Sequence, residues 1–166
     1  MARENDQLVT LPLLDRLTDL DPKTRAEPGM TRAQSVRMLK AALRRNLEWL
    51  FNTRANHDLP PPTELPEVFK SVINYGLPDF TNLSFSTLRD RNKLLRQLEV
   101  AITMFEPRLM GVQVRIVDTD MEIGKSVRFQ IDGFLKMDPA PEHVSFDTVL
   151  DIPSGEYEVK GETSAG

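Results

Sequence analysis

The sequence contains no cysteine and only two histidines among its 166 residues. A chain without cysteine cannot build a disulfide scaffold, a thiolate nucleophile or a zinc site with thiolate ligands. The histidines, His57 and His143, lie in or beside expected loops, and neither has ligand-type neighbours at the spacing of a metal site. We therefore predict two surface histidines, no metal site and no cofactor.

Long hydrophobic runs are also missing. No stretch of about 18 apolar residues occurs, so no membrane-spanning helix is predicted. The start of the chain is polar and acidic, without the apolar segment that is typical of a secretory signal. We expect a cytoplasmic protein with no direct membrane insertion.

The usual catalytic motifs do not occur. There is no phosphate-binding glycine loop, no Gly-x-Ser-x-Gly and no His-Glu-x-x-His. The densest carboxylate run, Asp118–Gly124, lacks the sixth-position glycine and twelfth-position glutamate of a calcium loop, so we expect a solvated hairpin turn there. No motif places the two facing carboxylates that a glycosidase needs. The sequence favours a protein that is not an enzyme, with a peptidoglycan hydrolase as an alternative.

Charge is distributed unevenly around a net value of −4. Residues 31–56 hold six basic residues and one acidic residue, whereas residues 109–166 hold five basic and eleven acidic residues. Such segments either pair within the fold or present opposite charges to neighbours. A nucleic-acid-binding domain is a second alternative because Arg37, Arg44 and Arg45 could contact phosphates. The acidic chain as a whole and the scarcity of stacking aromatics near these arginines argue against it.

Residues 1–30 read as an N-terminal arm. Pro12, Pro22 and Pro28 prevent a long helix there, because proline lacks the amide hydrogen that a helix interior needs. The arm also carries an apolar group of four leucines: Leu11, Leu13, Leu14 and Leu17. We expect this group either to pack on the chain's own domain or to dock on a partner.

Two long amphipathic helices are predicted. The first begins after Thr31, which forms a capping box with Gln34, and ends near Asn52; its apolar stripe is Val36, Leu39, Leu43, Leu47 and Leu50. The second runs from about Ser86 to Phe105 and ends before Pro107; its predicted buried face is Leu88, Leu94, Leu95, Leu98, Ala101, Ile102 and Phe105.

Between these helices, the proline-rich residues 58–66 predict an extended connector. A short helix is expected over residues 67–75, with Gly76 as its left-handed C-terminal cap.

After Pro107 the hydrophobic period changes to two, which predicts four strands separated by turn signals. The strands are centred on residues 112–116, 127–137, 144–152 and 157–159, and Gly133 indicates a bulge or a close backbone approach. Apolar and polar residues alternate, so one face is covered and the other open. We predict an α+β fold, with two long amphipathic helices and a short helix on one face of a four-stranded antiparallel sheet. The expected domain covers residues 31–160, with a flexible tail over 161–166.

The end of the second long helix carries an unexpected carboxylate. Glu106 opposes the helix dipole and directly precedes the helix-stopping Pro107. Once the chain extends, Glu106 and Arg108 share a side and form a donor–acceptor pair. This pair is either a weak local surface contact or part of an interface with a partner.

Four segments resemble the TssE family of type VI secretion systems, in the family's order: Leu14–Leu17, Arg45–Arg54, Ser71–Phe80 and Phe105–Leu109. The resemblance covers about residues 11 to 160 and extends to phage-tail baseplate wedge proteins historically labelled lysozyme-like. It implies a structural subunit of a membrane-docked baseplate in the cytoplasm. The implied partners are the wedge proteins TssF and TssG, TssK, and the sheath proteins TssB and TssC. The signature tripeptide matches Glu106, Pro107 and Arg108, so the resemblance favours their placement at an interface.

A mechanism of assembly follows as a hypothesis. A free edge of the sheet would pair with a strand of a sheath subunit, because unpaired backbone groups on an edge are a template for another chain. Sheath growth would then start at the baseplate. A proline in an edge strand near Val144–Val149 should block sheath initiation, but the sequence alone does not identify which strand forms the edge.

Overall fold

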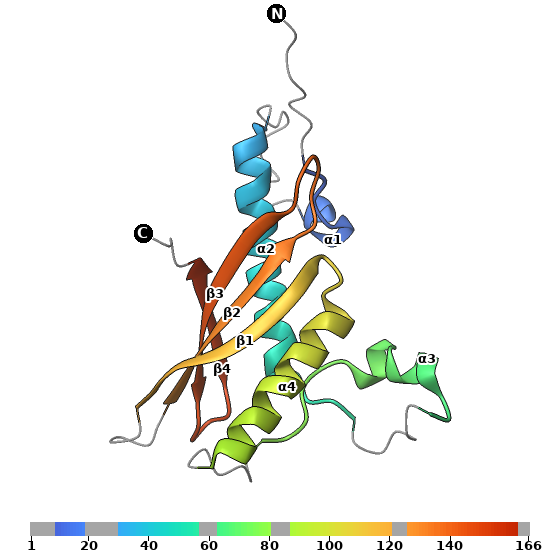
Figure 1. The fold of residues 1–166 in the computed structure, drawn as a ribbon. Coiled ribbons are helices and arrows are strands. Elements are labelled where there is room, and N and C mark those ends of the chain that lie inside the picture. Colours follow the sequence, from blue (N-terminus) through green and yellow to red (C-terminus); the bar gives the residue numbers. More distant parts are fainter. Residues whose placement is uncertain (1–8, 19–29, 57–62, 81–86, 121–125, 163–166) are drawn as a thin grey trace, which may run out of the picture. The chain divides into compact units, whose positions relative to one another are not determined.

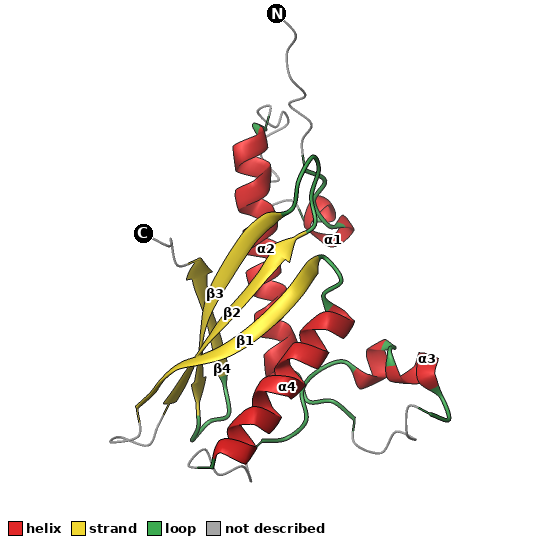
Figure 2. Ribbon diagram, viewed as in Figure 1, coloured by secondary structure: helices red, strands yellow, loops and turns green. Residues whose placement is uncertain are grey.

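The computed structural model describes residues 9–18, 30–56, 63–80, 87–120 and 126–162 (Figures 1 and 2). It contains the helices α1 (Leu13–Leu17), α2 (Arg32–Asn52), α3 (Pro66–Phe69) and α4 (Leu88–Phe105), the 3-10 helix η1 (Val72–Asn74), and the strands β1 (Leu109–Asp120), β2 (Ser126–Leu135), β3 (Glu142–Asp151) and β4 (Tyr157–Glu162). The chain divides into two compact units, Met1–Leu43 and Arg44–Gly166. The predicted α+β class is confirmed, whereas the predicted division into arm, domain and tail stays a prediction.

In the first unit, the predicted capping box is present at the start of α2. The Thr31 N–H donates to Gln34 Oε1 at 2.8 Å, and the Gln34 N–H donates to Thr31 Oγ1 at 3.3 Å. The backbone N–H of Val9 donates to the Ser35 hydroxyl at 3.3 Å, which ties the arm to the first turn of α2. Helix α1 has no buried residue, and its three leucines are each more than 60 % exposed.

The apolar stripe of α2 is confirmed at four of its five positions. Leu39, Leu43, Leu47 and Leu50 are at most 3 % exposed, whereas Val36 is only half-buried. Because each buried leucine contributes about 1.5–3 kcal/mol, this stripe accounts for much of the stability of the helix. The predicted connector lies largely outside the described residues, as does His57.

The predicted helix over residues 67–75 is wrong. Helix α3 ends at Phe69, and the separate 3-10 turn η1 follows it. The Ser71 hydroxyl explains the break, because it donates to the Val68 carbonyl at 2.6 Å and accepts from the Ile73 N–H at 3.3 Å. Such local side-chain bonds compete with helix continuation.

Gly76 has a different role from the predicted helix cap. Its φ is +122°, and a Cβ placed on it would lie 2.4 Å from the Thr53 carbonyl oxygen. This close approach allows two backbone hydrogen bonds to form around it, from Ala55 N–H to Leu77 O at 2.9 Å and from Leu77 N–H to Thr53 O at 2.8 Å. A glycine at this position therefore allows the end of α2 to form backbone hydrogen bonds with the segment before α4.

Helix α4 covers the predicted residues from Leu88 onward. The Thr87 hydroxyl caps its N-terminus by accepting from the Asp90 N–H at 3.2 Å. The predicted face is buried at Leu94, Leu98, Ala101 and Ile102, and this helix packs against β1. Leu88 was wrongly placed on that face, since it is 74 % exposed in the first turn.

The four strands form an antiparallel meander in the order β1-β2-β3-β4. One face is apolar and lies against α4 and the end of α2 (Figure 1). The buried residues of the strands are Leu109, Val114, Val127, Phe129, Ile131, Leu135, Val144, Ser145, Phe146, Thr148, Leu150, Tyr157 and Val159. The predicted role of Gly133 is confirmed: its missing Cβ would lie 3.3 Å from the Met110 carbonyl oxygen, beside a bulge of β1.

The topology corrects the predicted edge near Val144–Val149. That segment belongs to β3, which pairs with β2 on one side and with β4 on the other. The short fourth strand adds outside β3 and covers its backbone. The two edges of the sheet are therefore β1 and β4.

Substituting Gly76 with alanine should destabilise the chain by about 2–4 kcal/mol, because the new Cβ meets backbone atoms at a strained φ. Denaturant unfolding measures this change. Gly161→Ala is the matched control, since among the described residues no atom lies within 4 Å of a Cβ built there. Equal stability of the two variants would contradict the close approach at Gly76.

Candidate interface sites

The junction between α4 and β1 brings together the three predicted site residues. Glu106 is the C-cap of α4, and its N–H donates to Ile102 O at 2.8 Å. The Leu109 N–H donates to Glu106 O at 3.0 Å, and the Lys136 N–H donates to Arg108 O at 2.8 Å. These backbone bonds fix the turn, and Pro107 stands exposed at its tip.

Glu106 and Arg108 form a two-point ion pair. Arg108 Nε lies 2.5 Å from Glu106 Oε1, and Arg108 Nη2 lies 2.5 Å from Glu106 Oε2. The Glu106 side chain is 6 % exposed and that of Arg108 is 25 % exposed. The pair therefore differs from a solvated surface pair, because the carboxylate is buried and only the arginine reaches the surface.

Tyr75 adds an aromatic wall to this junction. Its ring packs edge-on against Phe105, with 5.3 Å between the ring centroids. Burial raises the pKa of Tyr75, and the negative charge of Glu106 raises it further. The 3-10 turn η1 directly precedes this tyrosine and exposes Val72 and Ile73 at 83 % and 55 %. Exposed apolar side chains thus lie two and three residues before the tyrosine that packs on Phe105.

Each edge of the sheet is bonded by a side chain from a long helix, a feature that sequence reasoning missed. At β4, the Tyr157 N–H donates to Asn52 Oδ1 and Asn52 Nδ2 donates to Tyr157 O, both at 2.8 Å. At β1, the Val114 N–H donates to Glu99 Oε1 at 3.0 Å. In the sequence, each of these side chains is only a polar residue near the buried face of a helix. Such a pattern does not predict which strand the residue bonds.

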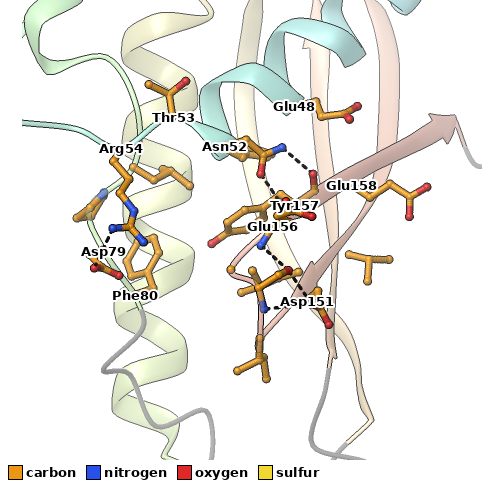
Figure 3. A pocket seen from close by; sticks show the side chains of 18 residues that line it. Glu48, Asn52, Thr53, Arg54, Asp79, Phe80, Asp151, Glu156, Tyr157 and Glu158 are labelled. Carbon is orange, nitrogen blue, oxygen red and sulfur yellow. Dashed lines mark hydrogen bonds and ion pairs between the residues drawn. The ribbon is translucent and has the colours of Figure 1, made fainter.

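A cavity of about 840 Å³ lies beside the Asn52–Tyr157 contact, between the end of α2 and the turn from β3 to β4. Figure 3 shows Asn52 and Tyr157 facing each other, with Arg54 and Asp79 on the opposite side of the cavity. The charged residues that line it are Glu48, Asp79, Asp151, Glu156, Glu158 and Arg54. The cavity is therefore acidic, since five of these six residues are carboxylates.

The Tyr157 hydroxyl is buried and finds no hydrogen-bond partner among the described residues. Its ring packs between Phe51, at 5.5 Å, and Phe129, at 6.5 Å, measured between centroids. Burial raises the pKa of Tyr157 well above its ordinary value of 10.0. An apolar surrounding without a hydrogen bond disfavours both the phenolate and, to a smaller degree, the neutral hydroxyl.

The other sequence candidates stay apart from these sites. His143 lies near the start of β3, against Phe134 and 3.8 Å from Asp132. Most of the carboxylate run Asp118–Gly124 lies outside the described residues, and in the described part of the chain no group of three or more His, Cys, Asp or Glu residues is placed to hold a metal.

On the surface of α2, the Arg45 guanidinium lies 5.7 Å from the ring centroid of Trp49, which is 53 % exposed. No helix in the described residues is both long and apolar enough to cross a membrane.

Replacing Tyr157 with phenylalanine should raise the free energy of unfolding at neutral pH by about 1 kcal/mol, because it removes a buried hydroxyl that lacks a partner. In the wild type, the raised pKa favours the fold fully below about pH 10, and this contribution declines as the pH rises toward the folded pKa. The variant should therefore lose stability less steeply above pH 10. Denaturant unfolding at pH 7 and pH 11 measures both effects, with Tyr75→Phe as the comparison. A loss of stability at pH 7 would contradict the missing bond.

Comparison with known proteins supports the resemblance found in the sequence. Comparison with curated protein sequences gives no match. The family model described as "Baseplate wedge protein gp25" matches residues 37–140, from α2 to the turn before β3. The matched segment includes the junction at Glu106–Arg108 and both edge-bonding side chains. Since the match covers more than half of the 166 residues, the chain belongs to the gp25 family of baseplate wedge proteins.

Proposed function

We propose that this protein is the TssE-type subunit of a type VI secretion baseplate, located in the cytoplasm at the membrane-docked machine. The family match over residues 37–140 carries this proposal. In this role the chain is a structural component without catalytic activity. Its partners are the wedge proteins TssF and TssG, together with TssK and the sheath proteins TssB and TssC.

The turn at Glu106, Pro107 and Arg108 is the proposed contact with the wedge. Pro107 is exposed and Arg108 is partly exposed, so both reach the surface at the proposed contact. Glu106 is nearly covered, and it acts by holding the guanidinium in one orientation through two hydrogen bonds. A fixed guanidinium loses less side-chain entropy on binding than a free one. The exposed Val72 and Ile73 add apolar area on the neighbouring turn.

An edge of the sheet is the proposed contact with the sheath. A strand that pairs there continues the hydrogen-bond ladder, so its direction and register follow from the sheet. The first ring of sheath subunits would thereby take its orientation from the baseplate. This is the step in which the subunit starts sheath polymerisation.

The two alternatives have less support. A peptidoglycan hydrolase would use carboxylates on either side of a sugar-sized cleft. The acidic cavity is large enough to consider, but its carboxylates lie beside the structural contact between Asn52 and Tyr157. A nucleic-acid-binding domain would need a basic surface, and the chain is acidic overall.

The wedge contact is tested by removing the ion pair as a whole. Arg108→Ala alone leaves a buried carboxylate without its partner, which destabilises the fold by several kcal/mol, of order 3, and confuses the result. The double variant Glu106→Gln/Arg108→Gln removes both charges and should keep the folded state. Affinity purification from the native cytoplasm, read by mass spectrometry, should recover wedge and sheath proteins with the wild type and lose them with the double variant.

The matched control is Arg115→Gln/Asp132→Asn, which removes a second arginine–carboxylate pair on the open face of the sheet. It should co-purify with the same partners as the wild type. If the Glu106/Arg108 double variant also co-purifies normally and is folded by circular dichroism, the junction is not the wedge contact. If the wild type recovers no baseplate protein, the proposed function itself fails.

A further inference from the structure

We infer that the outer face of α4 is a second docking surface, and that its occupant is an acidic amphipathic helix of a wedge protein. The surface consists of a stripe of three basic side chains that leads into an apolar groove. The inference rests on the proposed function, because it adds a second surface to the wedge contact and gives the chemistry of the segment that binds there.

The basic stripe is formed by Arg89, Lys93 and Arg96, which are all exposed. Their spacings of four and three residues place them on one side of α4. Val100, four residues further on, continues the same line and is 58 % exposed. The buried residues of the helix lie on the opposite side, at Leu94, Leu98, Ala101 and Ile102. Within the described parts of the chain, none of the three basic side chains takes part in an ion pair.

The helix itself gains no stability from this stripe. Like charges three and four residues apart repel each other, and Arg89 lies in the first turn, where the helix dipole already presents positive charge. The two carboxylates of α4 are bonded elsewhere. Asp90 accepts from the Thr87 hydroxyl at 2.7 Å, and Glu99 accepts from the Val114 N–H at 3.0 Å. The stripe therefore presents net positive charge that an acidic partner would neutralise.

An apolar groove of about 400 Å³ begins where the stripe ends. Its apolar lining comes from α4 and from the segments before that helix, and includes Phe69, Pro78, Val100, Met104 and Phe105. Arg96 is the only charged residue among the described residues that line the groove. Pockets that hold ligands have volumes of about 300–1,000 Å³, so this groove is large enough to receive a side chain. The stripe and the groove share Arg96 and form one surface.

The wall of the groove opposite α4 is held by hydrogen bonds within the subunit. The Ala55 N–H donates to Leu77 O at 2.9 Å, and Asn74 Nδ2 donates to Phe69 O at 2.9 Å. A wall that is already in place loses less conformational entropy on binding than one that must first become ordered. The groove is therefore preformed in the free subunit.

The spacing of the stripe identifies a helix as the occupant. Because a helix rises about 1.5 Å per residue, the basic residues follow each other at about 4.5–6 Å along the axis, close to the helical pitch of about 5.4 Å. A helix that lies along α4 presents acidic residues at the same spacings of four and three. An apolar residue four positions beyond the last acidic one would then enter the groove. A nucleic acid could contact the stripe but has no apolar side chain for the groove.

Titration calorimetry on the full chain, with the purified TssF–TssG complex as the probe, tests this surface. The variant Arg89→Glu/Lys93→Glu/Arg96→Glu should bind the probe about tenfold or more weakly, because it places like charges opposite the acidic helix. Val100→Asp should weaken binding to a similar degree by placing a carboxylate at the mouth of the groove. Added salt should weaken binding of the wild type more than that of the triple variant.

The matched control is Arg37→Glu/Arg44→Glu/Arg128→Glu, which makes the same change in net charge at exposed arginines outside α4. It should bind the probe with the affinity of the wild type. Thermal unfolding separates lost binding from lost structure. The α4 triple variant should have a Tm equal to or above that of the wild type, since it removes repulsion and places a carboxylate in the first turn. A lower Tm would contradict the repulsion along the stripe.

The outcomes separate this inference from the proposed function. Unchanged affinity of the α4 variants, or an equal loss in the control, would overturn the docking surface and leave the baseplate role standing. The same holds if the wild type does not bind the probe but still recovers baseplate proteins by affinity purification. Loss of binding only to phosphatidylserine vesicles or to duplex DNA would reassign the stripe to a lipid or a nucleic acid and reject the helix. If the wild type neither binds the probe nor recovers baseplate proteins, both proposals are wrong.

Discussion

The ion pair between Glu106 and Arg108 holds the point at which the chain changes from helix to sheet. The end of a helix carries partial negative charge, and a buried carboxylate there would be unstable alone. Arg108 follows Glu106 by two residues, and its planar guanidinium bonds both carboxylate oxygens of Glu106. The negative charge of Glu106 is therefore neutralised by a residue of the same turn. Backbone bonds to Leu109 and Lys136 extend this fixed turn into the first two strands. This turn joins α4 to β1, and the two elements pack against each other.

The sheet that follows is completed by the helices in two ways. Their apolar faces cover one side of the sheet, and their polar side chains reach its edges. Asn52 meets β4 and Glu99 meets β1. An exposed edge strand is a hazard for a protein that exists free before it assembles, because it pairs with any available strand. The use of a neutral amide on one edge and a carboxylate on the other makes the two edges chemically unequal.

Sequence reasoning predicted the elements whose signals are local. The Thr31 capping box, the leucine stripe of α2 and the alternation in the strands each depend on neighbours within a few residues. It failed at Ser71, where a local side-chain bond to Val68 breaks the short helix. It also failed where a distant contact decides the structure, since Gly76 is required by a backbone segment some twenty residues earlier, at Thr53. The pairing of Glu106 with Arg108 followed from their spacing, but the burial of the carboxylate depends on packing that no local pattern encodes.

The edges show the same limit at longer range. Asn52 and Tyr157 lie 105 positions apart, and Glu99 and Val114 lie 15 apart. Polar residues beside an apolar stripe are common on helices, so neither signal could name its partner without the fold. The order of the strands was likewise out of reach, because a fourth segment as short as Tyr157–Glu162 decides whether β3 is interior.

Trp49 has a consequence for optical studies of this protein. It is the one tryptophan of the chain, and it stands on the surface of α2 beneath Arg45 instead of in the core. Its fluorescence therefore senses the surroundings of an outer helix face more than the loss of core packing. Emission would change when another molecule covers that face. The chain thus carries a built-in optical reporter of docking on α2, without an attached dye.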